Sequence, residues 1–140
     1  MTEPQLMHAS CVSVMGRGVL ICGPSGAGKS TLALHLMACG ADLVADDQTV
    51  LTRQGDRLVA ACPPALSGLI EARGVGILTA TPVKDAQITL VADLGAPETE
   101  RLPPLRYVTL LGLPIALVMG RGNDHFSASV LCYLKGGRQT

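Results

Sequence analysis

One stretch of eight residues, 23–30, constrains this chain more than any other. It reads GPSGAGKS and has the G-x-x-x-x-G-K-[ST] spacing of a phosphate-binding loop. A short apolar run at 18–22 precedes it and is typical of a buried strand, and the apolar stretch 31–39 predicts a helix that ends near Gly40. This order of strand, glycine-rich loop and helix predicts an α/β domain with a polyphosphate site at the loop.

The residue types in the loop explain how it would hold phosphate. Glycines allow successive backbone N–H groups to turn toward phosphate oxygens, and the following helix N-terminus adds a favourable field. Lys29 is expected to reach the β- and γ-phosphates, and the Ser30 hydroxyl to bind Mg²⁺. The alternative, a structural glycine turn, is disfavoured because all eight positions and both flanks agree. The expected nucleotide-binding residues are Gly23, Pro24, Ser25, Gly26, Ala27, Gly28, Lys29, Ser30 and Thr31.

Composition limits the class of protein. The 140 residues suit one domain, residues 1–140, and 11 basic residues balance 11 acidic ones, which argues against nucleic-acid binding. No apolar run is long enough to span a bilayer, and residues 1–5 lack the features of a secretion signal. We therefore expect a cytoplasmic protein without a membrane partner. The five scattered cysteines are interpreted as small buried hydrophobic residues.

The rest of the chain predicts a mixed β-sheet around the strand–loop–helix unit. Segments 10–14 and 18–22 form a predicted hairpin that leads into the loop, and a crossover returns the chain to a strand at 43–45. The segment 95–105 reads as an exposed loop, and Asn123 or Asp124 is expected to cap a last helix that ends near Leu134. Further strands are expected at 49–52, 57–61, 87–93, 107–111 and 114–118.

Acidic residues follow two of these strands. Asp46 and Asp47 end the strand at 43–45, and strand ends in such sheets lie on the ligand side. Two such carboxylates can hold Mg²⁺ or accept a proton from an attacking hydroxyl. Alternation along a strand predicts that they point to opposite faces, so that one addresses the nucleotide. Asp93 ends another apolar strand and is an alternative candidate for the carboxylate that assists Mg²⁺ binding.

The segment 66–78 places charges among apolar residues and glycines. If 70–73 is extended, Glu71 and Arg73 share a face and either pair with each other or both face a ligand. Spacing alone leaves these alternatives open. His8, just before the first hairpin, is by itself more typical of a solvated side chain.

These motifs together resemble a known family, the bacterial HPr kinase/phosphorylase, in a short form without its N-terminal domain. The resemblance rests on 23–30, on 40–47 at the matching distance, and on 68–78, which is similar to the family's signature motif. It covers roughly residues 8–118. It implies a P-loop kinase domain that uses ATP and Mg²⁺ to phosphorylate a serine of the phosphocarrier protein HPr, and a hexameric assembly.

The resemblance also implies roles for individual residues. Asp47 matches the carboxylate that takes the proton from the target serine and returns it in the reverse direction. Ser30 and Glu71 match Mg²⁺ ligands, and Asp46 is added to this metal set from its position at the end of the strand 43–45. His8 matches an active-site histidine. Lys29 matches the phosphate-binding lysine, and Arg101 is similar to a family arginine.

One segment departs from the family pattern. The family carries a proline- and arginine-rich loop tied to phosphorolysis of the phosphoserine, whereas the corresponding stretch here, 113–118, lacks that arginine and Arg121 follows it. The forward kinase reaction is therefore the main hypothesis, and the reverse reaction stays open. A small-molecule P-loop kinase and a nucleotide-dependent regulatory ATPase or switch are the alternatives. The chain has little room for a kinase lid and lacks a guanine-reading Asn-Lys-x-Asp motif.

Overall fold

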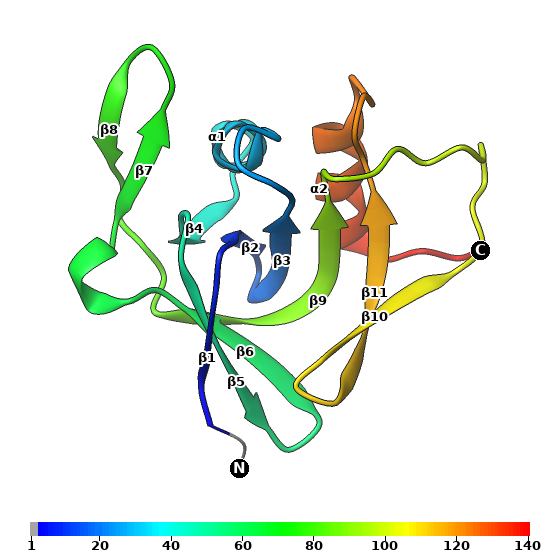
Figure 1. Cartoon of the computed structure of the whole chain (residues 1–140), viewed down its shortest axis with the longest axis horizontal. Coiled ribbons are helices and arrows are strands. Elements are labelled where there is room, and N and C mark those ends of the chain that lie inside the picture. Colours follow the sequence, from blue (N-terminus) through cyan, green and yellow to red (C-terminus); the bar gives the residue numbers. More distant parts are fainter. Residues whose placement is uncertain (1–2) are drawn as a thin grey trace.

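The computed structural model describes residues 3–140 (Figure 1). Over these residues nine strands form one mixed sheet, beside which stand a separate two-stranded hairpin and the helices α1 (Lys29–Ala38) and α2 (Phe126–Gly136). The sheet contains β1 (Gln5–Met7), β2 (Ser10–Val14), β3 (Arg17–Cys22), β4 (Asp42–Ala45), β5 (Thr49–Gln54), β6 (Arg57–Ala61), β9 (Asp85–Asp93), β10 (Arg106–Leu110) and β11 (Leu113–Met119). The hairpin consists of β7 (Leu69–Ala72) and β8 (Gly76–Thr79), preceded by the 3-10 turn η1 (Pro64–Leu66).

The strand that leads into the phosphate loop lies in the middle of the sheet. The order is β1-β5-β6-β9-β3-β2-β4, and β11 joins β9 and carries β10 at its outer edge. β2 is antiparallel to both β3 and β4, so β3 and β4 run in the same direction with β2 between them. The predicted mixed sheet around a strand–loop–helix unit is therefore confirmed.

Apolar side chains on both faces of the sheet fix this arrangement. On one face Val12, Ile21 and Leu90 pack against α1 and α2 through Leu36 and Val130. On the other face the central strands meet buried side chains of β5, β6 and β11, so the sheet curls over a second core. Burial of this kind contributes about 25 cal/mol per Å² of apolar surface. Because β3 is buried on both faces, the loop that follows it has a rigid base.

Parallel pairing gathers the functional loops at one edge of the sheet. β9 lies between β3 and β11 and is parallel to both. The chain therefore leaves all three strands on the same side, where the phosphate loop, the segment after Asp93 and the β11–α2 turn lie together (Figure 1). In open α/β sheets this is the edge that binds ligands.

Some local expectations are wrong. α2 begins at Phe126 with His125 as its N-cap, because the Asn123 side chain instead accepts a hydrogen bond from the His125 amide at 3.0 Å and shapes the preceding turn. Cys39 and Cys132 are exposed rather than buried, since one lies at the end of α1 and the other on the outer side of α2.

Two expectations concern the chain as a whole. The one about a secretion signal rests partly on Met1 and Thr2, which lie outside the described residues. Within residues 3–140 neither helix has both the length and the apolar character that a membrane crossing requires.

Candidate active site

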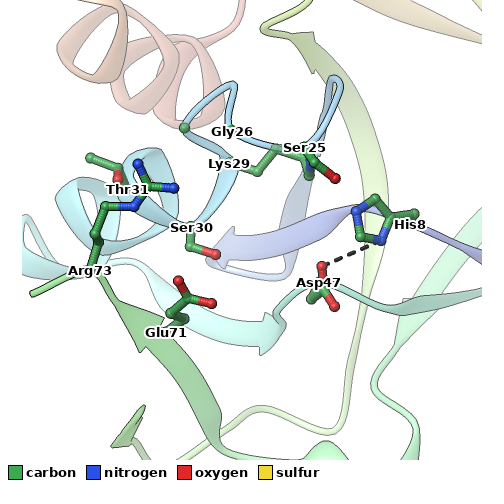
Figure 2. A pocket seen from close by; sticks show the side chains of 10 residues that line it. His8, Ser25, Gly26, Lys29, Ser30, Thr31, Asp47, Glu71 and Arg73 are labelled. Atoms are coloured by element: carbon green, nitrogen blue, oxygen red, sulfur yellow. Dashed lines mark ion pairs between the residues drawn. The ribbon is translucent and has the colours of Figure 1, made fainter. Parts of the chain in front are cut away.

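A cleft of about 230 Å³ opens over the phosphate loop (Figure 2). Its walls come from four parts of the chain: the β1–β2 connection, the loop with the first turn of α1, the segment after β4, and the β7–β8 hairpin. The lining residues are His8, Ser25, Gly26, Gly28, Lys29, Ser30, Thr31, Asp47, Glu71 and Arg73. The structure thus brings together most of the residues that the sequence singled out.

The phosphate loop has the backbone that its glycines allow. Gly26 and Gly28 have φ angles of 84° and 100°, a left-handed region that disfavours side chains, and Gly28 caps α1 directly. The first amides of an α-helix have no intrahelical carbonyl partner, so they are free to bind an anion. The Lys29 ammonium lies along the loop and donates to the carbonyls of Gly23 at 2.9 Å and Pro24 at 3.1 Å. The loop therefore presents amides and one cation to the cleft.

Asp46 is a buried hub beneath the loop, with 8% of its surface exposed. Its Oδ1 accepts hydrogen bonds from Ser30 Oγ at 2.7 Å and from Ser10 Oγ at 2.8 Å, and its Oδ2 accepts the Glu71 amide at 3.0 Å. One carboxylate therefore fixes α1, β2 and β7 relative to one another. Asp93 does not link the loop to other elements in this way, because its Oδ1 accepts a hydrogen bond from the nearby Gly95 amide at 2.7 Å. Of these two acids, Asp46 contacts the loop serine.

Asp47 faces the cleft from the next position. Its φ of 67° turns the backbone into the left-handed region, which aspartate tolerates better than most residues. Asp47 Oδ1 lies 3.3 Å from His8 Nδ1, and both side chains are more than half exposed. An exposed pair of this kind contributes at most about 1 kcal/mol to stability. The pair is therefore better suited to orienting a carboxylate in the cleft than to holding the fold.

Glu71 and Arg73 both line the cleft, and Figure 2 shows the Glu71 side chain near Ser30 and Arg73 near Thr31. β7 ends at Ala72, so Arg73 already lies in the turn to β8. No ion pair joins Glu71 to Arg73 in the structure of residues 3–140. Of the two open alternatives, the structure shows the one in which both residues face the cleft.

Arg101 lies elsewhere in this chain. It is exposed on the long β9–β10 loop and lines a different hollow with Tyr133 and Arg138. The loop is held there because Arg138 donates to the Pro103 carbonyl and Arg106 pairs with Glu98. The structure of the single chain therefore does not bring Arg101 to the cleft.

Ser10 is a polar residue at the site that sequence reasoning missed. It is fully buried, donates to Asp46 and accepts the Asp47 amide at 3.3 Å. Its only signal in the sequence is that it lies two residues after His8, because a bend at His8 separates β1 from β2 and strand alternation does not apply there. Cys22 lies next to the loop but is a poor nucleophile, because burial, with Asp93 nearby, raises its pKa to about 11.

The central parallel strands, the phosphate loop at the start of α1 and the acids beyond β4 define a P-loop α/β nucleotide-binding domain. The sequence profile described as HPr Serine kinase C-terminal domain matches residues 1–93. The chain therefore belongs to this family, as the resemblance in its sequence indicated.

Individual relatives agree with this assignment. The HPr kinase/phosphorylase of Cupriavidus necator is 41% identical over 124 residues, which cover 80% of this chain and 38% of the relative. That of Bordetella pertussis is 39% identical over 127 residues, covering 81% and 41%. The chain thus spans about two fifths of the length of these curated relatives. The solved HPr(Ser) kinase/phosphatase of Coxiella burnetii superposes with a TM-score of 0.81 at 25% identity and covers 94% of each chain.

Proposed function

We propose that this chain transfers the γ-phosphoryl group of ATP to a serine hydroxyl of HPr in a Mg²⁺-dependent reaction. The observation that carries the proposal is the Asp47 carboxylate, which faces the phosphate-loop cleft together with Lys29. A protein that only binds a nucleotide has no need of a proton acceptor at that position. The names of the relatives, HPr kinase/phosphorylase, support HPr as the acceptor.

In this proposal the phosphate loop holds the donor. Residues 23–31 surround the β- and γ-phosphates with backbone amides, and Lys29 exchanges its contacts with the loop carbonyls for phosphate oxygens. Phosphoryl transfer depends mainly on positioning and on neutralisation of charge, which amides and a lysine at a helix N-terminus provide.

The residues beneath the loop fit a Mg²⁺ ion. Hydroxyl and carboxylate oxygens are the donors that this hard cation prefers, and Ser30 and Glu71 supply them, with the Asp46 carboxylate behind both. Asp46 already accepts three hydrogen bonds, so its contribution is to orient Ser30 and Glu71. When bound, the ion would neutralise charge on the phosphate oxygens.

Asp47 carries the proton transfer. As the serine oxygen bonds to phosphorus and the bond to the β-phosphate oxygen breaks, the Asp47 carboxylate takes the hydroxyl proton and ADP leaves. His8 Nδ1, 3.3 Å from Asp47 Oδ1, holds that carboxylate toward the cleft. Arg101 enters the proposal only within an assembly, such as the hexamer that the family resemblance implies.

The test is transfer of label from γ-labelled ATP to purified HPr in the presence of Mg²⁺. We expect Asp47→Asn to keep nucleotide binding and to lower the transfer rate by about 10²–10⁴-fold, the range for loss of a general base. Asparagine also adopts positive φ readily, so the backbone at this position should be retained. A variant that transfers phosphate at a near-normal rate would falsify the role of Asp47.

Two further measurements distinguish the kinase from the alternative functions. ATP hydrolysis that HPr does not change would favour a regulatory ATPase, and label on a small molecule instead of HPr would favour a metabolite kinase. Adding inorganic phosphate to phosphorylated HPr tests the reverse reaction, for which the sequence lacks the family's arginine at 113–118. Pyrophosphate in the products would establish phosphorolysis, and its absence would restrict the chain to the forward direction.

A further inference from the structure

The backbone that carries the candidate proton acceptor is strained. The Gln48 amide donates a hydrogen bond to the Asp46 carbonyl at 2.7 Å, which closes a three-residue turn with Asp47 at its centre. The positive φ of Asp47, 67°, makes this turn the rare and strained form of the γ-turn. A backbone of this kind persists only where the surrounding structure holds it. Contacts from outside the turn must therefore keep Asp47 in this conformation.

Two hydroxyl side chains, those of Ser10 and Thr49, tie this turn to the start of β2. Ser10 Oγ accepts a hydrogen bond from the Asp47 amide at 3.3 Å. Just after the turn, Thr49 Oγ1 donates to the Ala9 carbonyl at 2.8 Å. Both hydroxyl residues are completely buried, and neither lines the cleft. They hold the turn from behind, while the Asp47 carboxylate faces His8 across the cleft (Figure 2).

Packing alone does not require a hydroxyl at either position. In β2 the next two residues, Cys11 and Val12, are apolar and fully buried, and so is Leu51 in β5. A buried hydroxyl costs free energy unless it is hydrogen-bonded, so an apolar side chain would serve the core at least as well. What an apolar side chain could not supply is the pair of hydrogen bonds that Ser10 and Thr49 make beside the turn.

The contact between Ser10 and Asp46 sets the direction of the Ser10 hydroxyl. An ionised carboxylate only accepts hydrogen bonds, so the Ser10 proton is directed to Asp46 Oδ1, at 2.8 Å. The Ser10 oxygen then keeps its lone pairs for the Asp47 amide. The same Asp46 Oδ1 accepts from Ser30 Oγ at 2.7 Å. A chain of hydrogen bonds therefore connects the phosphate loop to the backbone of the candidate proton acceptor.

We propose that Ser10 and Thr49 are positioning residues for phosphoryl transfer, an inference that rests on the proposed function. They act through Asp47, because they hold the strained turn that places its carboxylate where the acceptor hydroxyl arrives. They touch neither the donor nor the acceptor. A displacement of about 1 Å in a reacting group can lower a rate about a hundredfold. Loss of either hydroxyl should therefore slow the chemical step and leave the binding of ATP and HPr largely unchanged.

The experiment measures kcat and KM for transfer of label from ATP to HPr with Mg²⁺ present, and the dissociation constant of ATP by titration calorimetry. We expect Ser10→Ala and Thr49→Val to lower kcat about ten- to a hundredfold, and to change KM for HPr and the ATP constant less than about threefold. Thr49→Ser keeps the hydroxyl and should restore most of kcat. Thr49→Val retains nearly the shape of threonine, so it carries the test even if Ser10→Ala does not fold.

Matched controls are available on the same two strands. Ser13→Ala changes a buried serine toward the other end of β2, and Thr52→Val removes a hydroxyl that donates to the Val59 carbonyl within the β5–β6 hairpin. Each control should leave kcat within about twofold of the unmodified chain.

A double variant separates positioning from a general effect on the fold. If Thr49 acts through Asp47, adding Thr49→Val to Asp47→Asn should lower kcat by less than about threefold further, because the group that it positions is already lost. A hydroxyl that only stabilises the fold would lower kcat by the same factor in both backgrounds.

Each outcome decides the inference. If either single variant keeps kcat within about threefold of the unmodified chain, the residue that it changes has no positioning role. An equal loss from Thr49→Val with and without Asp47→Asn would overturn the inference as a whole. If the unmodified chain transfers no label to HPr, the proposed function fails and this inference fails with it. An active unmodified chain with unaffected variants refutes only the positioning role.

Discussion

Replacing Asp46 by asparagine is the most direct test of how the site is held together. The carboxylate accepts three hydrogen bonds, at 2.7, 2.8 and 3.0 Å, while only 8% of the residue is exposed. A carboxamide has a single acceptor oxygen. If the asparagine side chain is oriented to keep the larger number of hydrogen bonds, its oxygen still accepts from Ser30 and Ser10. The NH₂ group then faces the backbone amide of Glu71, and two donors cannot form a hydrogen bond with each other.

The magnitude follows from these contacts. The lost bond from the Glu71 amide to a charged group costs about 1.5–3 kcal/mol, because the amide is left without its partner. The two remaining bonds become neutral and lose roughly half their strength, which adds about 1 kcal/mol. We therefore expect Asp46→Asn to lower the free energy of unfolding by about 3 kcal/mol, a large part of the roughly 5–15 kcal/mol typical of a domain.

The assay is urea unfolding followed by circular dichroism, with the slope m compared between variants. Asp42→Asn makes the same substitution at an exposed position of the same strand, β4, and should change stability by less than about 0.5 kcal/mol. If Asp46→Asn costs no more than Asp42→Asn, Asp46 does not hold the three elements together and the description of it as a hub is wrong.

Two further predictions concern packing and thiol chemistry. Gly120→Ala should destabilise the protein by about 1–3 kcal/mol through overpacking, since the added methyl group meets the Phe126 ring, and an unchanged melting temperature would contradict this packing. At pH 8 the exposed Cys39 and Cys132 should react quickly with a thiol reagent, whereas Cys22 should react slowly. Its pKa of about 11 means that its reaction rate should rise steeply between pH 8 and pH 11, and rapid labelling of Cys22 at pH 8 would refute its burial next to the loop.

Much of the fold could be predicted because its signals are local. The phosphate loop and its two flanks are contiguous in sequence, and the hairpin turn at Gly55 and Asp56 follows directly from residue preference. β1 was missed, since it is only three residues long and largely exposed, and it exists because residues 5–7 pair with β5. A segment of this kind carries no pattern of its own.

The candidate site was predictable as far as it depends on strand ends. The loop residues and Asp47 reach the cleft, as expected for segments that end at one edge of the sheet. Glu71 also reaches it, but from the separate β7–β8 hairpin, and spacing alone had left its orientation open. The position of Arg101 was not predictable, because contacts made by Arg138 and Arg106 hold its loop over another hollow. These contacts depend on tertiary structure, and no periodic pattern of residues in the sequence predicts them.

The two adjacent aspartates divide their roles in a way that simple alternation does not describe. β4 ends at Ala45, and Asp46 turns inward to Ser30 beneath the loop. The positive φ of Asp47 then redirects the backbone so that the Asp47 side chain faces the cleft. Alternation assumes a strand that continues, and here the strand has already ended. Both carboxylates therefore serve one site, one beneath the phosphate loop and one inside the cleft.

Ser10 joins these two halves, since one hydroxyl donates to Asp46 and accepts from the Asp47 amide. Its place is set by the register of β2 against β3, in which Ser10 lies opposite Ile21, two residues before the loop begins at Gly23. A slip of one residue in this register would turn Ser10 to the other face of the sheet and separate both aspartates from their partner. The β2–β3 hairpin thus fixes the distance between the phosphate loop and the candidate proton acceptor, and it belongs to the site as much as the loop does.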